Sequence, residues 1–374
     1  MNILVISPWF APAWKNGGTV TATYQIYSHL SKFINIDVYT TNQNGDGYLK
    51  YKSCQIVQMN GLNVRYFNFI NKFKGAAWNP ILMVSLIKNF RKYDLIHLHG
   101  VRNAYAIILY LLHILFGVKY IITPHAGLMR NWMNTIGMIS LKKIYNNIIE
   151  KKIFNKSVFM HFLSDYEKDE SSSYYDNLNY KIIPNAVDYH KKNSKVYKRL
   201  KNKFVLVGRI HPQKGIENSI DFLIHNPKWT LDIIGPVDDY EYFKKIENLI
   251  DINKLKNRIS FLGYISNSEL RLKIKNYDIF LMPSIVEGVS IALLEALSIG
   301  LPCITSANIG NFQQIINYNC GWIIEDWKCE LKEINNLDKI IFKSNNAKKL
   351  IEEKYSLEQV SKAFVEMYKL SIKI

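Results

Sequence analysis

Each half of the chain opens with the same order of segments, and this repeat restricts the fold more than any other feature. The first apolar run is followed by a loop holding Gly17 and Gly18, and a helical pattern begins at Thr19. The second half restarts with an apolar run over 204–207, a glycine-bounded loop and a helical pattern over 216–224. A strand, a glycine loop and a helix in that order open a doubly wound α/β domain.

A second repeat supports two related domains. Asp94 precedes residues 95–99, where apolar residues alternate with His97 and His99, and Asp278 precedes the continuous apolar run 279–282. Each pattern is typical of a buried parallel strand. One such pair would be weak evidence, but two repeats in the same order favour two Rossmann-like domains. Further strands are predicted over residues 36–40, 120–123, 158–163, 230–234, 259–262 and 303–306.

The length of 374 residues also fits two domains of ordinary size. We place the first domain at residues 1–185 and the second at 204–352. The lysine-rich, polar stretch 186–203 between them is predicted to be a linker.

The positive charge is confined to one half of the chain. Residues 1–203 contain 27 Lys and Arg against 10 Asp and Glu, whereas residues 204–374 contain 21 of each, so the whole net charge of +17 lies in the first part. This asymmetry predicts an anionic partner for the first half: nucleic acid, an acidic membrane face or a phosphorylated substrate.

Cysteine spacing and hydropathy give the expected compartment. The four cysteines show no disulfide or metal-ligand spacing, which indicates a reducing environment. No signal peptide is recognised at the amino end. The longest uncharged stretch, 103–118, is shorter than the ~20 residues of a membrane span and is predicted to be a buried helix. We therefore expect a cytoplasmic protein.

Two cations flank the turn that follows the predicted strand 204–207. Arg209 and Lys214 lie five residues apart within Gly208–Gly215. Ligands of open α/β sheets bind at this end of the strands, and the two side chains could converge on one diphosphate. Alternatively, both are solvated surface charges.

Two acids follow the predicted strand 279–282. Glu287 precedes a helix expected to begin near Ser290, where an acid is also an ordinary helix-start residue. Glu295 lies in an apolar helical run, where an unpaired carboxylate would be costly unless it faced a polar site. Sugar hydroxyls suit such a carboxylate. The amides of Gly288, Val289 and Ser290 would suit phosphate.

These residues together resemble a known family signature. Gly208-Arg209, Lys214-Gly215 and the later Glu287 and Glu295-Ala296 are similar to the signature of the retaining glycosyltransferases of family 4, which have the GT-B fold. Nearly the whole chain takes part in the resemblance. Its further segments are Gly17-Gly18, Asp94 to Gly100, Thr123-Pro124-His125, Ile183 to Asp188 and Tyr355 to Tyr368.

The resemblance implies an architecture. It predicts two Rossmann-like doubly wound domains facing across a cleft. Residues 1–185 would bind the acceptor, and residues 204–352 would bind a nucleotide-sugar. Residues 353–374 would form a helix that crosses back and packs toward the N-terminal domain.

It also implies roles for single residues. Arg209 and Lys214 would neutralise the leaving nucleoside diphosphate in place of a metal, so neither a metal nor another cofactor is expected. Glu295 would hold the ribose, Glu287 would face the donor sugar, and His125 would lie beside sugar and acceptor. The remaining donor-binding residues would be Gly17, Gly18, Tyr264, Ile265, Gly288, Val289, Ser290 and Ile291.

Two points stay open at this stage. The family commonly has Phe-Gly where this chain has Val289-Ser290, so the identity of the donor sugar is undecided. His125 could be structural rather than catalytic. His97 and His99 alternate on one predicted strand and therefore share a face, as structural or site-lining residues without further metal ligands.

The expected function is transfer of a sugar from a nucleotide-sugar to a saccharide acceptor. A polyprenyl-diphosphate-linked glycan of O-antigen or capsule assembly would suit the basic first half. A membrane-surface helix is one interpretation of the stretch below, and a core-facing helix is the other. The stretch comprises Lys142, Lys143, Ile144, Ile148, Ile149, Lys151, Lys152 and Ile153.

Two alternative classes of function remain, another enzyme of the same fold and a nucleic-acid-binding protein. A nucleotide-sugar epimerase or a phosphorylase would share the fold. The net charge would suit a nucleic-acid-binding protein, but no motif of that class is present.

Overall fold

The computed structural model describes residues 1–70, 79–129, 149–172, 179–190 and 195–374. These residues divide into two compact units. The first unit consists of Met1–Ala186 together with Leu357–Ile374, and the second consists of Val187–Ser356. The described part of the predicted linker beyond Ala186 belongs to the second unit.

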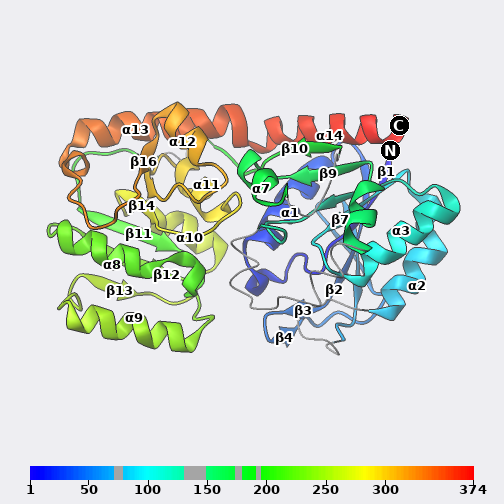
Figure 1. The fold of residues 1–374 in the computed structure, drawn as a ribbon, viewed down its shortest axis with the longest axis horizontal. Helices are drawn as coiled ribbons and strands as arrows, with labels where there is room; N and C mark the ends of the chain where they lie inside the picture. The colour runs from blue at the N-terminus through cyan, green and yellow to red at the C-terminus, as the bar shows by residue number, and fades with distance from the viewer. Residues whose placement is uncertain (71–78, 130–148, 173–178, 191–194) are drawn as a thin grey trace. The chain divides into compact units, whose positions relative to one another are not determined.

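The first unit is built on an eight-stranded sheet (Figure 1). All neighbouring strands are parallel except β5, which runs antiparallel to β6 at one edge. In spatial order the strands are β10 (Tyr180–Ile182), β9 (Phe159–Phe162), β8 (Tyr120–Thr123), β7 (Leu95–His99), β1 (Asn2–Ile6), β2 (Asn35–Thr41), β6 (Leu62–Phe67) and β5 (Ile56–Met59).

The second unit has a six-stranded parallel sheet with the same order of connections. In both sheets the first strand is central, the next strands extend to one side and the later strands to the other, as in Rossmann folds. In spatial order the strands are β13 (Ile259–Phe261), β12 (Thr230–Ile234), β11 (Lys203–Val207), β14 (Ile279–Met282), β15 (Cys303–Thr305) and β16 (Gly321–Ile323).

The structure confirms the predicted fold class of two Rossmann-like units. The predicted strands are confirmed, and their ends differ from the observed ones by at most one residue. In the two main sheets, strands β5, β6, β10 and β16 were not predicted. Each is short or is interrupted by polar or partly exposed side chains, so none of them shows a continuous apolar run.

The repeated aspartates have the same position in both sheets. Asp94 accepts a hydrogen bond from the Asn2 amide at 2.8 Å, at the start of central strand β1. Asp278 accepts one from the Lys203 amide at 3.3 Å, at the start of central strand β11. Each therefore fixes the beginning of the central strand beside it, and this contact explains the sequence repeat.

Helices cover the faces of both sheets. In the first unit, α1 (Gly18–Leu30) packs against α14 (Leu357–Lys373), and both bury apolar side chains in one core cluster. Their buried residues recur every three or four positions, which is the pattern of an amphipathic helix. The other helices used below are α2 (Pro80–Asn89), α3 (Ala104–Phe116), α6 (Lys151–Asn155), α7 (Asp165–Glu170), α8 (Ile216–His225), α9 (Tyr240–Ile252), α10 (Asn267–Ile274) and α11 (Ile291–Ser298).

Helix α3 corrects one prediction. The uncharged stretch around it was expected to be a buried helix, but only one side of α3 is buried. Its later residues Leu111, Ile114, Leu115 and Phe116 are each at least 50% exposed. An uncharged sequence does not reveal which side faces the core, because the apolar pattern continues around the helix. Among the described residues, no helix is long and apolar enough to cross a membrane.

Candidate active site

The loop after β11 positions Arg209 and Lys214 at the carboxyl end of the central strand. A short 3-10 turn, Pro212–Lys214, directs the lysine back so that its methylenes lie against Gly208, where a β-carbon would come within 2.9 Å of Lys214 Cε. Gly215 has a left-handed φ of +58°, and a β-carbon there would lie 2.3 Å from the Pro283 carbonyl oxygen. Gly215 is therefore required by its conformation and by the close backbone approach, whereas a side chain at Gly208 would displace Lys214.

Lys214 forms an ion pair with Glu287, which follows the neighbouring strand β14. Both side chains are largely but not fully buried, with 15% and 20% of their surface exposed. The Gln213 side chain donates to the Val286 carbonyl at 2.9 Å, and the Ile285 amide donates to the Gln213 carbonyl at 2.9 Å. These bonds hold the loops after β11 and β14 together.

Arg209 lies on the more open side of this loop. Its Nη1 pairs with Asp238 Oδ2 at 2.7 Å, and both side chains are more than a third exposed. Such a pair contributes little to stability. The guanidinium is therefore free to exchange this partner for a bound anion.

Glu295 lies in α11 with only 6% of its surface exposed. Among the described residues, its carboxylate has no hydrogen-bond partner. Burial raises the pKa of the Glu295 carboxyl to about 7, and the positive charge of Arg271 offsets only part of that rise. A buried carboxylate without a hydrogen-bond partner is costly, and this cost favours a ligand that supplies hydroxyl groups.

The other predicted donor residues lie near these loops in the chain. Residues Gly288, Val289 and Ser290 are buried, and α11 begins at Ile291, as expected from sequence. The first amides of a helix lack intrahelical acceptors and suit an anion. Tyr264 follows β13 and is 52% exposed.

The remaining predicted residues belong to the first unit. Gly17 has a left-handed φ of +92° and precedes α1, whose first residue is Gly18. His125 and Ala126 follow β8, and both have left-handed φ values of +51° and +63°. Two such residues in sequence are strained and need support from their surroundings.

Buried Glu167 supplies that support. Its carboxylate accepts hydrogen bonds from the Ala126 amide at 2.5 Å and from the Leu163 amide at 2.7 Å. Burial raises the pKa of Glu167 to about 7, although both amides lower it. This role could not be predicted, because Glu167 lies in the polar segment that forms α7.

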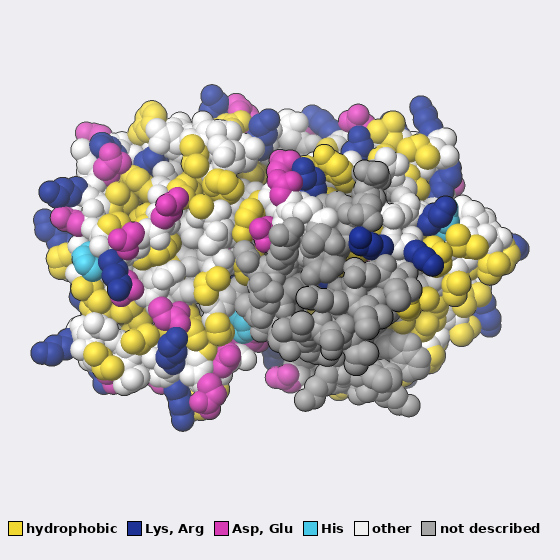
Figure 2. Space-filling view, in the orientation of Figure 1, with side chains coloured by type: hydrophobic (Ala, Val, Ile, Leu, Met, Phe, Trp, Pro, Cys, Tyr) yellow, Lys and Arg dark blue, Asp and Glu magenta, His cyan; other side chains and the backbone are white. Residues whose placement is uncertain are grey.

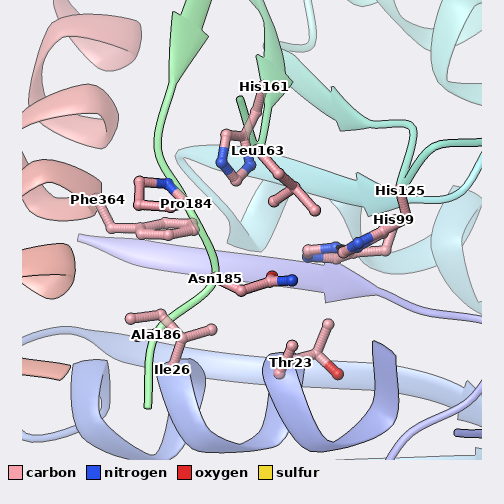
Figure 3. A pocket seen from close by; sticks show the side chains of 11 residues that line it. Thr23, Ile26, His99, His125, His161, Leu163, Pro184, Asn185, Ala186 and Phe364 are labelled. Atoms are coloured by element: carbon pink, nitrogen blue, oxygen red, sulfur yellow. Dashed lines mark hydrogen bonds between the residues drawn. The ribbon is translucent and has the colours of Figure 1, made fainter. Parts of the chain in front are cut away.

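A small pocket lies beside His125 in the first unit (Figure 3). Its cavity volume is about 10 Å³, about one water molecule. Figure 3 shows His99 and His125 next to each other, with His161 on another side. The lining residues are Ala22, Thr23, Ile26, His99, His125, His161, Leu163, Pro184, Asn185, Ala186 and Phe364.

Behind the pocket, hydrogen bonds join four histidines into one group, called here the histidine network. Three of the rings are buried, and burial lowers the pKa of all four, to about 3 for His125 and about 4 for His161. All four are therefore neutral at pH 7. The members of the network are Tyr27, His97, His99, Thr123, His125, His161 and Tyr368.

Sequence reasoning identified only part of this network. His97 and His99 do share one face, since both contact the hydroxyl of Tyr27. His161, Thr123 and the two tyrosines were missed. His161 is the third residue of β9, as His97 is of β7, and that polar position in an apolar strand was the available signal.

Solved structures of similar fold are GT-B glycosyltransferases. Sucrose-phosphate synthase from Thermosynechococcus elongatus superposes with a TM-score of 0.76 at 16% identity and covers 99% of both chains. Anabaena HepE superposes at 0.74 with 14% identity, again over 99% of both chains. These likenesses establish the GT-B fold.

Family comparisons then identify the chain. Residues 16–191 match the family described as Glycosyltransferase Family 4, and residues 189–357 match the one described as Glycosyl transferases group 1. Together the two matches cover residues 16–357. The chain belongs to the family-4 glycosyltransferases, as its signature predicted.

Similar curated proteins come from bacteria and archaea. An Escherichia coli UDP-Gal:alpha-D-GlcNAc-diphosphoundecaprenol alpha-1,3-galactosyltransferase is 29% identical over 69% of this chain and 68% of its own length. An uncharacterised glycosyltransferase of Methanocaldococcus jannaschii is 29% identical over 46% of this chain and 45% of its length. The Salmonella typhimurium O-antigen chain mannosyltransferase is 26% identical over 55% and 59%. The chain thus spans about half to two thirds of the curated relatives it matches.

Proposed function

We propose that this glycosyltransferase is a retaining, metal-independent enzyme that transfers a sugar from a nucleotide-sugar to a lipid-diphosphate-linked saccharide. The observation that carries the proposal is Glu295, a buried carboxylate without a partner among the described residues. It lies in the helix after β14, and β14 adjoins β11, whose loop holds Arg209 and Lys214. An acid for ribose hydroxyls and cations for phosphates suit one nucleotide-sugar.

In this proposal the two cations act on the leaving group. Breaking the bond between sugar and phosphate places negative charge on the diphosphate and positive charge on the anomeric carbon. Lys214 and Arg209 would exchange Glu287 and Asp238 for the phosphate oxygens, which stabilises the transition state more than the ground state. Glu287, released from Lys214, would face the donor sugar, and no metal is proposed.

The donor is proposed to carry a nucleoside diphosphate, with uridine tested first. Anabaena HepE has been solved with UDP and with UDP-glucose, and the Escherichia coli relative is a UDP-Gal enzyme. We would measure thermal shifts of the wild type and of Glu295→Gln with UDP, GDP, ADP and their sugars. A shift in the wild type that Glu295→Gln loses would support the site. An equal shift in both would contradict the role of Glu295.

For the acceptor, we propose a polyprenyl-diphosphate-linked saccharide of O-antigen or capsule assembly. The Escherichia coli relative acts on GlcNAc-diphosphoundecaprenol, and other relatives are named for O-antigen and capsule synthesis. Release of free nucleoside diphosphate only with this acceptor present would support transfer. Isomerised donor without release would indicate an epimerase, and dependence on inorganic phosphate would indicate a phosphorylase.

We also propose that the first unit contacts an anionic membrane face through α2 and α3. Figure 2 shows hydrophobic side chains gathered there beside Lys and Arg. The two helices and the turn after α2 contain no acid, and Lys88, Arg91 and Lys92 are exposed at the edge. The exposed apolar residues are Ile81, Val84, Ile87, Leu111, Ile114, Leu115 and Phe116.

The stretch first considered for membrane contact gives less support. Lys142, Lys143, Ile144 and Ile148 lie outside the described residues. Of the others, Ile153 in α6 is only 1% exposed, which favours the core-facing interpretation for that end.

Liposome flotation tests the surface on α2 and α3. Leu115→Ser combined with Phe116→Ser should abolish binding to vesicles containing anionic phosphatidylglycerol, because the apolar contact area is lost. Ile252→Ser, at a residue that is 67% exposed in the second unit, is the matched control and should bind like the wild type. Equal binding by all three proteins would exclude this surface.

A further inference from the structure

The histidine network contains enough fixed donors and acceptors to determine where its protons lie. At one end, His161 Nε2 lies 2.7 Å from the Ile183 carbonyl oxygen, which can only accept. His161 therefore has its proton on Nε2. Because this ring is neutral, its Nδ1 must accept, and the Thr123 hydroxyl donates to it at 2.7 Å.

The proton positions of His97 follow from those of His161 and Thr123. The Thr123 oxygen, having given its proton to His161, accepts from His97 Nε2 at 2.7 Å. His97 is buried and neutral, so its Nδ1 must be an acceptor. Two hydroxyls lie within reach of that nitrogen: Tyr368 from α14 at 2.7 Å and Tyr27 from α1 at 3.0 Å.

The choice between these two tyrosines determines the proton on His125. If Tyr368 donates to His97, the Tyr27 hydroxyl donates to His99 Nε2 at 2.5 Å. His99 then donates from Nδ1 to His125 Nε2 at 2.7 Å, and His125 has its proton on Nδ1. If Tyr27 donates to His97 instead, every later bond reverses, and His125 has its proton on Nε2.

The distances favour the first arrangement. It uses the 2.7 Å contact of Tyr368 with His97, whereas the alternative uses the longer 3.0 Å contact of Tyr27 and leaves Tyr368 only a 3.4 Å contact with the Tyr27 hydroxyl. A well-formed bond in a buried site is favoured over a stretched one.

We propose that Tyr368 is a positioning residue that fixes His125 as the Nδ1–H tautomer. It acts through His97, Tyr27 and His99 and does not touch His125 itself. Nδ1 is the ring nitrogen of His125 without a hydrogen bond among the described residues, and His125 lines the pocket. His125 thus offers the pocket an N–H donor and not a basic nitrogen. Such a donor suits a ligand oxygen, for example that of a sugar hydroxyl.

Removal of the Tyr368 hydroxyl should reverse the hydrogen bonds between Tyr27 and His125. In Tyr368→Phe, only Tyr27 can donate to His97, so His99 must donate to Tyr27 and His125 must donate to His99. The proton of His125 then moves from Nδ1 to Nε2. Its free nitrogen becomes an acceptor, although no atom near His125 has been changed.

Nitrogen-15 NMR of histidine-labelled protein at pH 7.5 tests this directly and needs no substrate. In the wild type, His125 should show a protonated Nδ1 and an unprotonated Nε2, and Tyr368→Phe should exchange these two signals. Tyr120→Phe is the control. It removes an equally buried hydroxyl that bonds to the Ile153 carbonyl, outside the network, and should leave the His125 signals unchanged.

Two outcomes would overturn the proposal: a wild-type His125 protonated on Nε2, or unchanged His125 signals in a folded Tyr368→Phe protein. Tyr27→Phe provides a second check. It breaks the path between His97 and His99, so His97 should keep its tautomer while the His125 signals become a mixture of both forms. If His125 stays fixed in this variant, the path does not run through Tyr27.

The kinetic consequence rests on the proposed function. With donor and acceptor in hand, Tyr368→Phe should lower kcat about tenfold and leave the donor KM within twofold, since the phosphate and ribose residues are untouched. Tyr120→Phe should match the wild type in both. If the wild-type protein shows no transferase activity, the proposed function is refuted. The NMR result would still decide the tautomer of His125.

Discussion

The two units have the same framework and different chemistry at the ends of their central strands. Both have the strand order of a Rossmann fold, and both fix the start of the central strand with an aspartate. In the first unit, however, the strand ends hold neutral, buried rings in the histidine network. In the second unit they hold charged, partly exposed pairs such as Lys214 with Glu287. A common framework thus leaves the chemistry to the loops that follow the strands.

The largest expected difference between the units is in how much each repeated aspartate contributes to stability. Asp278 is fully buried, pairs with Lys195 at 3.4 Å and also accepts from the Lys201 amide at 2.7 Å. Asp278→Ala should destabilise the second unit by about 3–5 kcal/mol, because it leaves a buried lysine without its partner. Asp94→Ala removes an exposed contact and should cost about 1 kcal/mol.

Urea unfolding followed by hydrogen exchange in β11 and β1 would measure both changes. Equal losses in the two variants would show that the aspartates are equivalent in energy as well as in position.

Loss of a cation should affect turnover rather than folding. Lys214→Ala is expected to lower turnover by about a hundredfold or more, because a charge facing the leaving diphosphate is lost. The melting temperature should change by only a few degrees, since the pair with Glu287 is partly exposed. Lys245→Ala removes a more exposed ion pair with Glu217, away from the proposed site, and should leave turnover unchanged. Wild-type turnover in Lys214→Ala would contradict the proposed site.

The buried Glu295 carboxylate should lower the free energy of unfolding of the ligand-free protein. Its folded pKa of about 7 lies above the value of an unfolded glutamate, so the folded state binds more protons between about pH 4.5 and 7. Stability therefore falls as pH rises through this window and levels off above it. Glu295→Gln should remove that slope and add about 1–3 kcal/mol of stability at pH 8. Thermal unfolding of both proteins from pH 4.5 to 8 would measure the slope.

The same series of pH values tests the donor role. Glu295→Gln should bind the nucleotide more weakly in spite of its higher stability. A variant that is both less stable and less active at pH 8 would instead indicate a purely structural carboxylate.

The histidine network should respond to pH in the opposite direction. Its histidines have folded pKa values below the unfolded value of about 6.5, so the unfolded state takes up more protons as pH falls. Protection of β7 and β8 should decrease below pH 6.5 by up to about tenfold per pH unit for each histidine involved. Glu167, with its raised pKa, offsets part of this loss.

Hydrogen exchange, corrected for intrinsic rates, would compare β7 and β8 with β11 and β14 at pH 7 and pH 5. Equal changes in both units would mean that the network does not contribute to the pH response.

Much of the fold was predictable because continuous apolar runs define buried parallel strands. Residues 120–123, 230–234 and 279–282 were located without error on this basis. The half-exposed face of α3 was not, since Leu115 and Phe116 lie in an uncharged helix in which apolar residues occur on all sides. Edge strand β5 was missed for the related reason that few of its side chains are buried.

The candidate site was predictable where its residues are close in sequence and chemically unusual. Glu295 stood out as an acid in an apolar helix, and Lys214 stood out through its glycine-bounded turn. The contact of Lys214 with Glu287 joins residues 73 positions apart, and only the register of β11 with β14 brings them together. The path from Tyr368 to His97 spans 271 positions and left no local trace.

The place of α14 in the first unit has a consequence for synthesis. Val360, Phe364, Met367 and Tyr368 belong to the core of that unit, yet they are translated after the whole of Val187–Ser356. The second unit is one continuous segment and can fold while the chain is still growing. The first unit must wait, with the face beneath α14 uncovered, until the ribosome has passed residue 368.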